Sequence, residues 1–148
     1  MTYLGEDPRL HAVHETLKAA RAPRPRVAII DPRAPLRAIG PWVTEVIRRA
    51  GGIEVLASDG SMADADLIIF AFAGETIDHA TARGQHLLDD PAWAWARERR
   101  CLVMDASLLY ESGPRLIDAV VALAPCIAPS LFAPAPTDQV RALTSPSA

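Results

Sequence analysis

Two patterns of apolar residues alternate along this chain. Unbroken apolar runs, such as residues 27–30 and 67–72, are typical of parallel strands that are buried on both faces. Elsewhere the apolar residues recur every third or fourth position, as in 43–50, where Val43, Val46, Ile47 and Ala50 form one stripe. That spacing predicts a helix with one buried face. Strands that alternate with helices indicate an α/β fold.

The pattern predicts one helix followed by four rounds of strand and helix. The first helix is capped by Asp7, begins at Pro8 and breaks in the segment 22–25. We expect strands at 27–30, 53–56, 67–72 and 101–104, and helices at about 41–50, 76–88, 91–99 and 113–124. This order predicts a three-layer sandwich, with a mostly parallel sheet of four to five strands and helices on both faces. Turn-forming residues predict a loop at 57–66.

The length of 148 residues fits a single domain that can bury a core. We divide the chain into an N-terminal helix at 1–22, a single lobe at 23–132 and a proline-rich tail at 133–148. Prolines are frequent after residue 124, so we expect an irregular C-terminal segment with about a dozen disordered residues at its end.

Composition and charge restrict the partners of the protein. The net charge is −3 with a pI of about 5.8, and no basic stripe is evident, which argues against a nucleic-acid partner. No secretory signal pattern and no apolar run of about 18 residues is evident, so we expect no membrane span and a cytoplasmic location. In that reducing compartment, Cys101 and Cys126 are expected to be buried thiols and not a disulfide.

Candidate ligand-binding residues follow the predicted strands. In an open α/β sheet, ligands bind outside the carboxyl ends of the strands. Arg33, Arg37 and Trp42 follow the first strand, Gly74 and Glu75 follow the third, and Tyr110 follows the fourth. The loop of Tyr110 also carries Leu108 and Leu109, which we expect to be exposed. Trp93 and Trp95 are two residues apart, so we expect them on different faces of their helix. One would lie in the core and the other would be a lid or an interface contact, and core packing alone is the alternative.

Metal binding and catalysis have weaker support in the sequence. His11 and His14 are close enough to chelate a metal together, but no third ligand is evident, and we expect surface histidines. His79 and His86 lie about 10.5 Å apart along a helix, which is too far for one ion. No nucleotide-binding, nucleophile-elbow or zinc-protease motif is present, so we expect a protein that is not an enzyme.

Three stretches of the chain together resemble one known family. They are residues 40–52, which begin Gly-Pro-Trp-Val-Thr-Glu and close on Gly-Gly; residues 65–69 with Gly74 just after; and residues 93–118, which end Gly-Pro-Arg-Leu-Ile-Asp. In order and spacing they resemble the C-terminal lobe of the substrate-binding proteins of ABC transporters for vitamin B12 and iron siderophores. The resemblance covers residues 24–132.

The resemblance implies one lobe of a periplasmic-binding-protein-like fold and a cobalamin-like ligand. Family members hold the ligand between two lobes, whereas this chain has one, so we expect a homodimer whose two rims rebuild the cleft. The helix at 11–20 resembles a remnant of the helix that connects the lobes. Arg48 and Arg49 stand where the family often carries a glutamate that docks on permease arginines, so permease docking in the family's manner is not expected.

Two functions follow from these expectations. The first is non-catalytic binding of cobalamin, haem, another tetrapyrrole or a metal chelate, with aromatic faces and arginines as contacts. Its predicted ligand-binding residues are Arg37, Trp42, Phe72, Gly74, Glu75, Tyr110 and Arg115. Core packing is the alternative for Trp42 and Tyr110, and a structural ion pair is the alternative for Arg115. The second function is a ligand-free protein-interaction or regulatory module derived from such a lobe.

Overall fold

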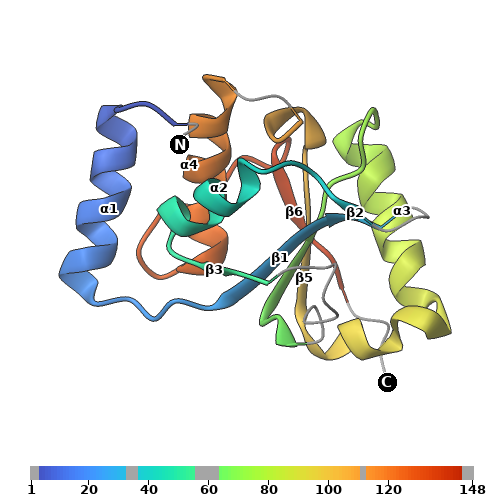
Figure 1. Cartoon of the computed structure of the whole chain (residues 1–148). Helices are drawn as coiled ribbons and strands as arrows, with labels where there is room; N and C mark the ends of the chain where they lie inside the picture. The colour runs from blue at the N-terminus through green and yellow to red at the C-terminus, as the bar shows by residue number, and fades with distance from the viewer. Residues whose placement is uncertain (1–3, 33–36, 56–63, 111–112, 145–148) are drawn as a thin grey trace.

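A six-stranded, mostly parallel sheet runs through the middle of the molecule and separates helices on its two faces (Figure 1). The computed structural model describes residues 4–32, 37–55, 64–110 and 113–144. In chain order the elements are α1 Pro8–Ala20, β1 Arg26–Asp31, β2 Arg37–Ala38, α2 Val43–Ala50, β3 Ile53–Glu54, β4 Leu67–Phe70, α3 Ile77–Asp89, the 3₁₀ helix η3 Pro91–Glu98, β5 Arg100–Met104, the 3₁₀ helix η4 Ala106–Leu108, α4 Arg115–Ile127 and β6 Val140–Ala142. The predicted α/β three-layer architecture is confirmed.

The sheet is centred on β4, which pairs in parallel with β1 and with β5. In this register Phe70 lies between Ile30 of β1 and Val103 of β5. The other edge of β1 pairs with β3 in parallel and with β2 in antiparallel direction, and β6 is antiparallel to β5. Since β1, β4 and β5 are parallel, their carboxyl ends lie at one edge of the sheet.

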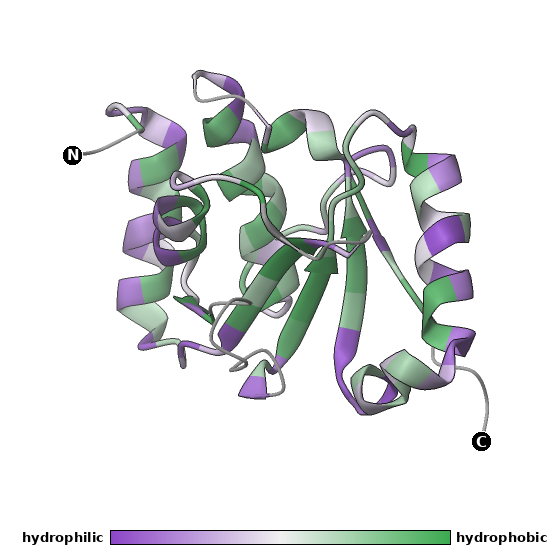
Figure 2. Cartoon of the chain, turned by 45° about the vertical axis from the view of Figure 1, so that its right-hand side comes forward, coloured by the Kyte–Doolittle hydropathy of each residue, from purple (hydrophilic) through white to green (hydrophobic). Residues whose placement is uncertain are grey.

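Side chains of the central strands alternate between two cores. On β4, Leu67 and Ile69 join the core covered by α1, α2 and α4, whereas Ile68 and Phe70 join the core covered by α3 and η3. Figure 2 shows the strands as hydrophobic along most of their length and the helices as hydrophilic on their outer sides. Burial on both faces is the reason that the strands read as unbroken apolar runs.

Local signals set the ends of the helices. The carboxylate of Asp7 accepts a hydrogen bond from the Arg9 backbone at the start of α1, and Thr76 caps α3 in the same way. α2 ends at Gly51, whose φ of 107° lies in the left-handed region that favours glycine. The helices α1, α3 and α4 have 13 residues each, and no helix in the described parts of the chain has the length and apolar character of a membrane span.

The two short antiparallel strands are not predicted by the sequence. β6 shows that the prediction of a disordered C-terminal end is wrong for 140–142, because Val140 pairs with Met104 and is buried. The open edge of β5 offers unpaired backbone groups, and this segment satisfies them. Residues 145–148 of the predicted disordered end lie outside the described residues, as does most of the loop predicted at 57–66.

Two predictions about single side chains are also wrong. Trp93 and Trp95 do not lie on separate faces: their rings stack with centroids 5.6 Å apart, because the segment is a narrow 3₁₀ helix around which large indoles reach each other. Trp93 also meets Phe70 edge to face at 5.5 Å. The apolar spacing of the helix predicted at 113–124 also predicts that Val121 packs, but Val121 is 37% exposed on α4.

Both cysteines are buried free thiols, as predicted. Burial raises the pKa of Cys101 and of Cys126 from the ordinary 9.0 to about 11. The folded state therefore keeps both protons at pH values where the unfolded chain loses them, so the free energy of unfolding is expected to fall as the pH rises from 9 to 11.

Thiol labelling checks the burial of the two cysteines, and chemical denaturation at pH 9 and at pH 11 checks the loss of stability. At pH 8 a disulfide reagent should react slowly with the native protein and rapidly after denaturation, because only a deprotonated, accessible thiol attacks. Cys101→Ala and Cys126→Ala should each remove one slow thiol and reduce the loss of stability between pH 9 and 11. Equal labelling rates for native and denatured protein would contradict the burial of these groups.

Candidate functional site

The candidate site is the rim formed by the loops that follow β1, β4 and β5 at the carboxyl edge of the sheet. β1 ends at Asp31, β4 runs into the turn at Ala73 and Gly74, and β5 runs into η4. Helices α2, α3 and α4 begin close to the same edge, because each one follows a strand or its loop. The rim therefore collects residues from three separate parts of the chain, as expected for a ligand site in an open α/β sheet.

A buried carboxylate connects the three loops. Asp31 is 6% exposed, and its Oδ2 lies 3.0 Å from the Tyr110 hydroxyl and 3.4 Å from the Ala73 backbone nitrogen. The same hydroxyl lies 3.2 Å from the carbonyl oxygen of Ala71. Tyr110 and Asp31 thus hold the loop after β5 against the ends of β1 and β4, and the phenol is half-buried between them.

Trp42 fixes the loop after β5 from the other side. Its indole N–H donates a hydrogen bond to the carbonyl oxygen of Leu109, and its ring packs against the core covered by α2 and α4. A Cβ at Gly40 would lie 2.6 Å from the Trp42 ring, so only glycine allows this close approach. The core-packing alternative therefore describes part of the role of Trp42, although its side chain stays partly exposed.

The loop after β5 is not the exposed apolar loop that the sequence predicts. Leu108 is 1% exposed and Leu109 is 0% exposed, because the backbone turns into η4 and directs both side chains into the core. The Asp105 carboxylate accepts a hydrogen bond from the Ser107 nitrogen at 3.0 Å and starts that turn. The apolar partner patch expected at Leu108 and Leu109 is therefore absent from the surface.

The turn after β4 carries a compact ionic cluster. Gly74 is exposed with a φ of 78°, and the next residue, Glu75, has a side chain only 10% exposed. Its Oε1 lies 3.0 Å from Arg83 Nε and 3.4 Å from His79 Nδ1. His79 is 68% exposed in the first turn of α3, so one imidazole stands at the rim with a carboxylate beside one of its nitrogens.

The structure brings together some of the predicted ligand-binding residues and not others. Trp42, Gly74, Glu75 and Tyr110 lie at the rim, and Arg115 is exposed at the start of α4. Phe72 is 1% exposed, and its ring packs in the core that α3 covers, with the Arg83 guanidinium 5.9 Å from the ring centroid. Arg37 pairs with Asp31 through the backbone of β2, whereas Arg33 lies outside the described residues.

Sequence reasoning missed two residues of this rim. Asp31 ends an apolar run, and a single acidic residue there gives no sign of burial before the partner from the loop after β5 is known. His79 is preceded by Glu75 at i−4, and that spacing on a helix start signals a pair. In the described parts of the chain, no group of three or more His, Cys, Asp or Glu side chains is placed to hold a metal ion.

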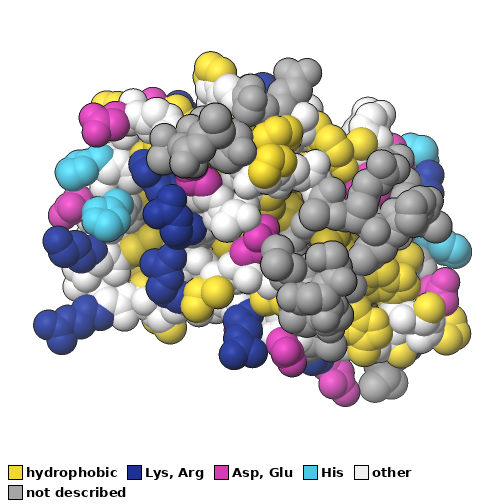
Figure 3. Space-filling model, in the orientation of Figure 1, with side chains coloured by type: hydrophobic (Ala, Val, Ile, Leu, Met, Phe, Trp, Pro, Cys, Tyr) yellow, Lys and Arg dark blue, Asp and Glu magenta, His cyan; other side chains and the backbone are white. Residues whose placement is uncertain are grey.

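One cavity of the structure lies away from the rim. It has a volume of about 1070 Å³ and lies between α1 and the last turn of α2, on the face seen in Figure 3. Trp42, Gly74 and Tyr110 do not line it. These exposed or partly exposed rim residues therefore lie outside this cavity.

Comparison with known proteins identifies no relative of this chain. No protein-family model, no curated protein and no solved structure matches the chain. The resemblance to the lobe of a substrate-binding protein stays a prediction, and the proposals below are supported by the residues of the chain itself.

Proposed function

We propose that this protein binds a small molecule at the carboxyl-edge rim without catalysing a reaction on it. The observation that supports this proposal most directly is the bonding of three strand-end loops to each other through Tyr110 and Asp31. Loops that are held in place before a ligand arrives lose little conformational entropy on binding. A rim of this kind, placed at strand ends, is the usual position of ligand sites in α/β sheets.

The side chains at the rim suit a large, flat ligand of the tetrapyrrole class that carries an acidic group, such as the propionates of haem or the phosphate of cobalamin, or a metal chelate of similar size. Trp42 and Tyr110 offer partly exposed aromatic rings for stacking. Arg115 is exposed and offers a guanidinium for a carboxylate of the ligand. The ligand's metal would supply Lewis acidity, and the imidazole of His79, oriented by Glu75, is the rim group suited to approach it.

We propose further that two copies close the site together. Trp42 and Tyr110 of the rim do not line the described cavity, whereas pockets for ligands of drug size or larger bury most of the ligand. A two-fold dimer with facing rims would place an aromatic pair and an arginine on each side of the ligand. Binding should then consume one ligand for two chains.

An absorbance titration tests this function. Hydroxocobalamin and haemin are added in turn to micromolar protein, the visible spectrum is recorded, and the mixture is run on gel filtration. We expect one of the two to shift its absorption band and to co-elute with a dimer. Unchanged spectra and separate elution of both compounds would overturn the proposal.

A matched pair of variants locates the site. His79→Gln should reduce the spectral shift and weaken binding about tenfold, because one metal-directed contact is lost. His86→Gln changes the same residue type two turns further along α3, where the side chain is also exposed, and should leave the titration unchanged. Equal titration curves for the two variants would show that the ligand binds away from the rim.

A further inference from the structure

A second surface of the molecule has features of a binding groove. The cavity of about 1070 Å³ extends along α1 from its first residues to Arg21 and Arg24, and its opposite wall is the last turn of α2. Its floor includes two leucines one heptad apart on α1: Leu17, which is partly exposed, and Leu10, which is 2% exposed and belongs to the core below. An open groove with an apolar floor along a helix is a shape that receives another helix.

Both walls of this groove are basic. His14 and Lys18 occur at i and i+4 on α1, and Arg21 follows as its left-handed C-cap. Arg48 and Arg49 stand on the opposite wall. Figure 3 shows dark blue side chains gathered on the side of the molecule where α1 and α2 lie, with two cyan histidines among them. This concentration of positive charge occurs in a chain whose net charge is −3.

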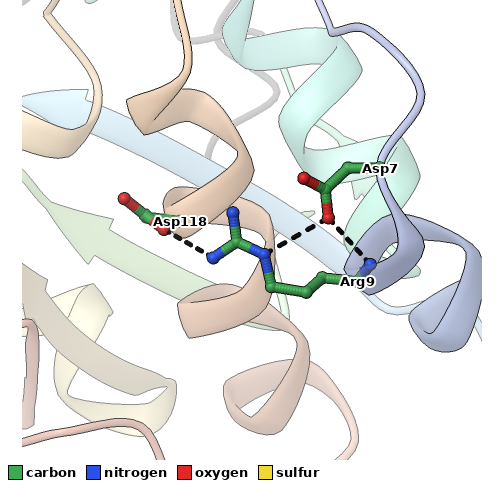
Figure 4. A network of polar contacts seen from close by, with 3 residues as sticks. All are labelled: Asp7, Arg9 and Asp118. Atoms are coloured by element: carbon green, nitrogen blue, oxygen red, sulfur yellow. Dashed lines mark hydrogen bonds and ion pairs between the residues drawn. The ribbon is translucent and has the colours of Figure 1, made fainter.

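The acidic residues nearest to the groove do not neutralise these cations. Glu6 and Asp7 line only the end of the groove at the start of α1, and Asp7 accepts hydrogen bonds from Arg9, whose guanidinium also lies 2.9 Å from Asp118 of α4 (Figure 4). In the parts of the chain that the structure describes, no carboxylate lies within ion-pair distance of Lys18, Arg21, Arg48 or Arg49.

Helix stabilisation explains only part of this charge. Lys18 and the two arginines of α2 lie in last turns, where a cation is favourable by roughly 0.3–1 kcal/mol. The end of α2 already has a cationic partner, because Arg24 Nη2 donates to the carbonyl oxygens of Arg48 and Gly52 at 3.2 Å each. Further cations that face one another across the groove repel, so their placement favours an anionic partner between them.

We propose that this groove is the docking site for an acidic amphipathic helix of a partner protein. Apolar residues of the guest helix contact the partly exposed Leu17, and carboxylates on its two flanks pair with the basic residues of the two walls. The floor and walls reproduce the apolar centre and polar rim of protein interfaces. The cavity follows the 13 residues of α1, a length of about 20 Å, so a helix of three to four turns matches it better than a single small anion does.

A designed peptide tests this proposal on the full-length protein. The probe is a stapled helix of about fifteen residues, with leucines on one face, glutamates on both flanks and a fluorescent label. Its two controls are a lysine version of the same peptide and a stapled peptide with the same residues in scrambled order. We expect the glutamate peptide to bind at micromolar concentration and to bind more weakly as the salt concentration increases. Its affinity should exceed that of both control peptides.

Charge reversal identifies the groove as the site. The double variant Lys18→Glu with Arg48→Glu changes one residue on each wall. It should weaken binding of the glutamate peptide by about tenfold or more and strengthen binding of the lysine peptide. The control variant, Arg26→Glu with Arg100→Glu, makes the same change of net charge at exposed residues that begin β1 and β5 and do not line the groove. It should affect both peptides far less.

Three results would overturn the proposal. The first is equal binding of the glutamate peptide and its scrambled control, or no binding of either. The second is an equal effect of the groove variant and the control variant, which indicates attraction by net charge alone. The third is complete displacement of the peptide by inorganic tripolyphosphate at equal concentration, which indicates a site for small anions. Circular dichroism and gel filtration of both variants verify that they are folded.

Discussion

Phe70→Ala is expected to lower the free energy of unfolding by about 4 kcal/mol. The side chain is fully buried on the central strand β4, where it meets Trp93 edge to face and lies 6.1 Å from the Phe72 ring centroid. Removing the ring deletes these contacts and leaves a cavity that η3 and α3 cannot fill, because they are attached to the sheet on both sides. A small domain is stable by only about 5–15 kcal/mol, so the loss is a large share of the total.

Chemical denaturation measures this loss, and Phe132→Ala is the matched control. Phe132 is only partly buried at the edge of the other core, so the same change there should cost less than half as much. The slope of the unfolding curve should stay constant in both variants. A loss below about 1 kcal/mol for Phe70→Ala would show that this part of the core relaxes around the missing ring.

Tyr110→Phe is expected to lower the free energy of unfolding by about 2 kcal/mol and to loosen the rim. The change keeps the ring and removes only the hydroxyl that lies 3.0 Å from the carboxylate of Asp31. Asp31 is 6% exposed, and a buried charge that loses a donor recovers little from water. Because the same hydroxyl also reaches the Ala71 carbonyl oxygen, the loops after β1, β4 and β5 lose a shared contact.

Ser107→Ala provides the control for this prediction. It also removes one hydroxyl from the η4 region, but its side chain is exposed, so the free energy of unfolding should change by less than about 0.5 kcal/mol. Hydrogen exchange should show faster exchange of the Ala73 amide in Tyr110→Phe and not in Ser107→Ala. Equal stabilities of the two variants would mean that the Tyr110 hydroxyl contributes no net stability at the rim.

The regular elements of the core are the part of the fold that the sequence predicts well. Val27–Ile30 and Leu67–Phe70 are apolar at every position. Such a run is typical of a strand that is buried on both faces, because all of its side chains then leave water. The stripe on α2 is equally clear, since Val43, Val46, Ile47 and Ala50 are all buried. Local spacing is sufficient in these cases because each element contacts the core through a repeating set of positions.

The missed strands and the corrected side chains have a different cause. β2 and β6 are two and three residues long, and each forms only because an edge of β1 or β5 lies within reach. Leu108 and Leu109 are adjacent, so no spacing rule indicates that η4 turns both into the core. Trp93 and Trp95 meet because their segment is a 3₁₀ helix, and composition does not distinguish that helix from an α-helix.

The candidate sites, like the fold, are only partly predictable from the sequence. The position of the rim at the carboxyl ends of β1, β4 and β5 follows from strand order alone, so Trp42, Gly74, Glu75 and Tyr110 are found from the sequence. The Asp31–Tyr110 contact joins residues 79 positions apart, and no local signal announces it. The basic groove likewise depends on α1 lying beside α2, which brings Lys18 opposite Arg48 and Arg49.

The sequence by itself determined the layers of this protein, the buried strands, and the edge of the sheet at which polar and aromatic residues gather. These properties depend on periodicity and on residues that are neighbours in the chain. Only the tertiary structure decided that Phe72 is in the core, that Tyr110 meets Asp31, and that Lys18 and Arg21 line one cavity together with Arg48 and Arg49. Such contacts join distant segments, and their geometry is set by how whole helices pack on the sheet.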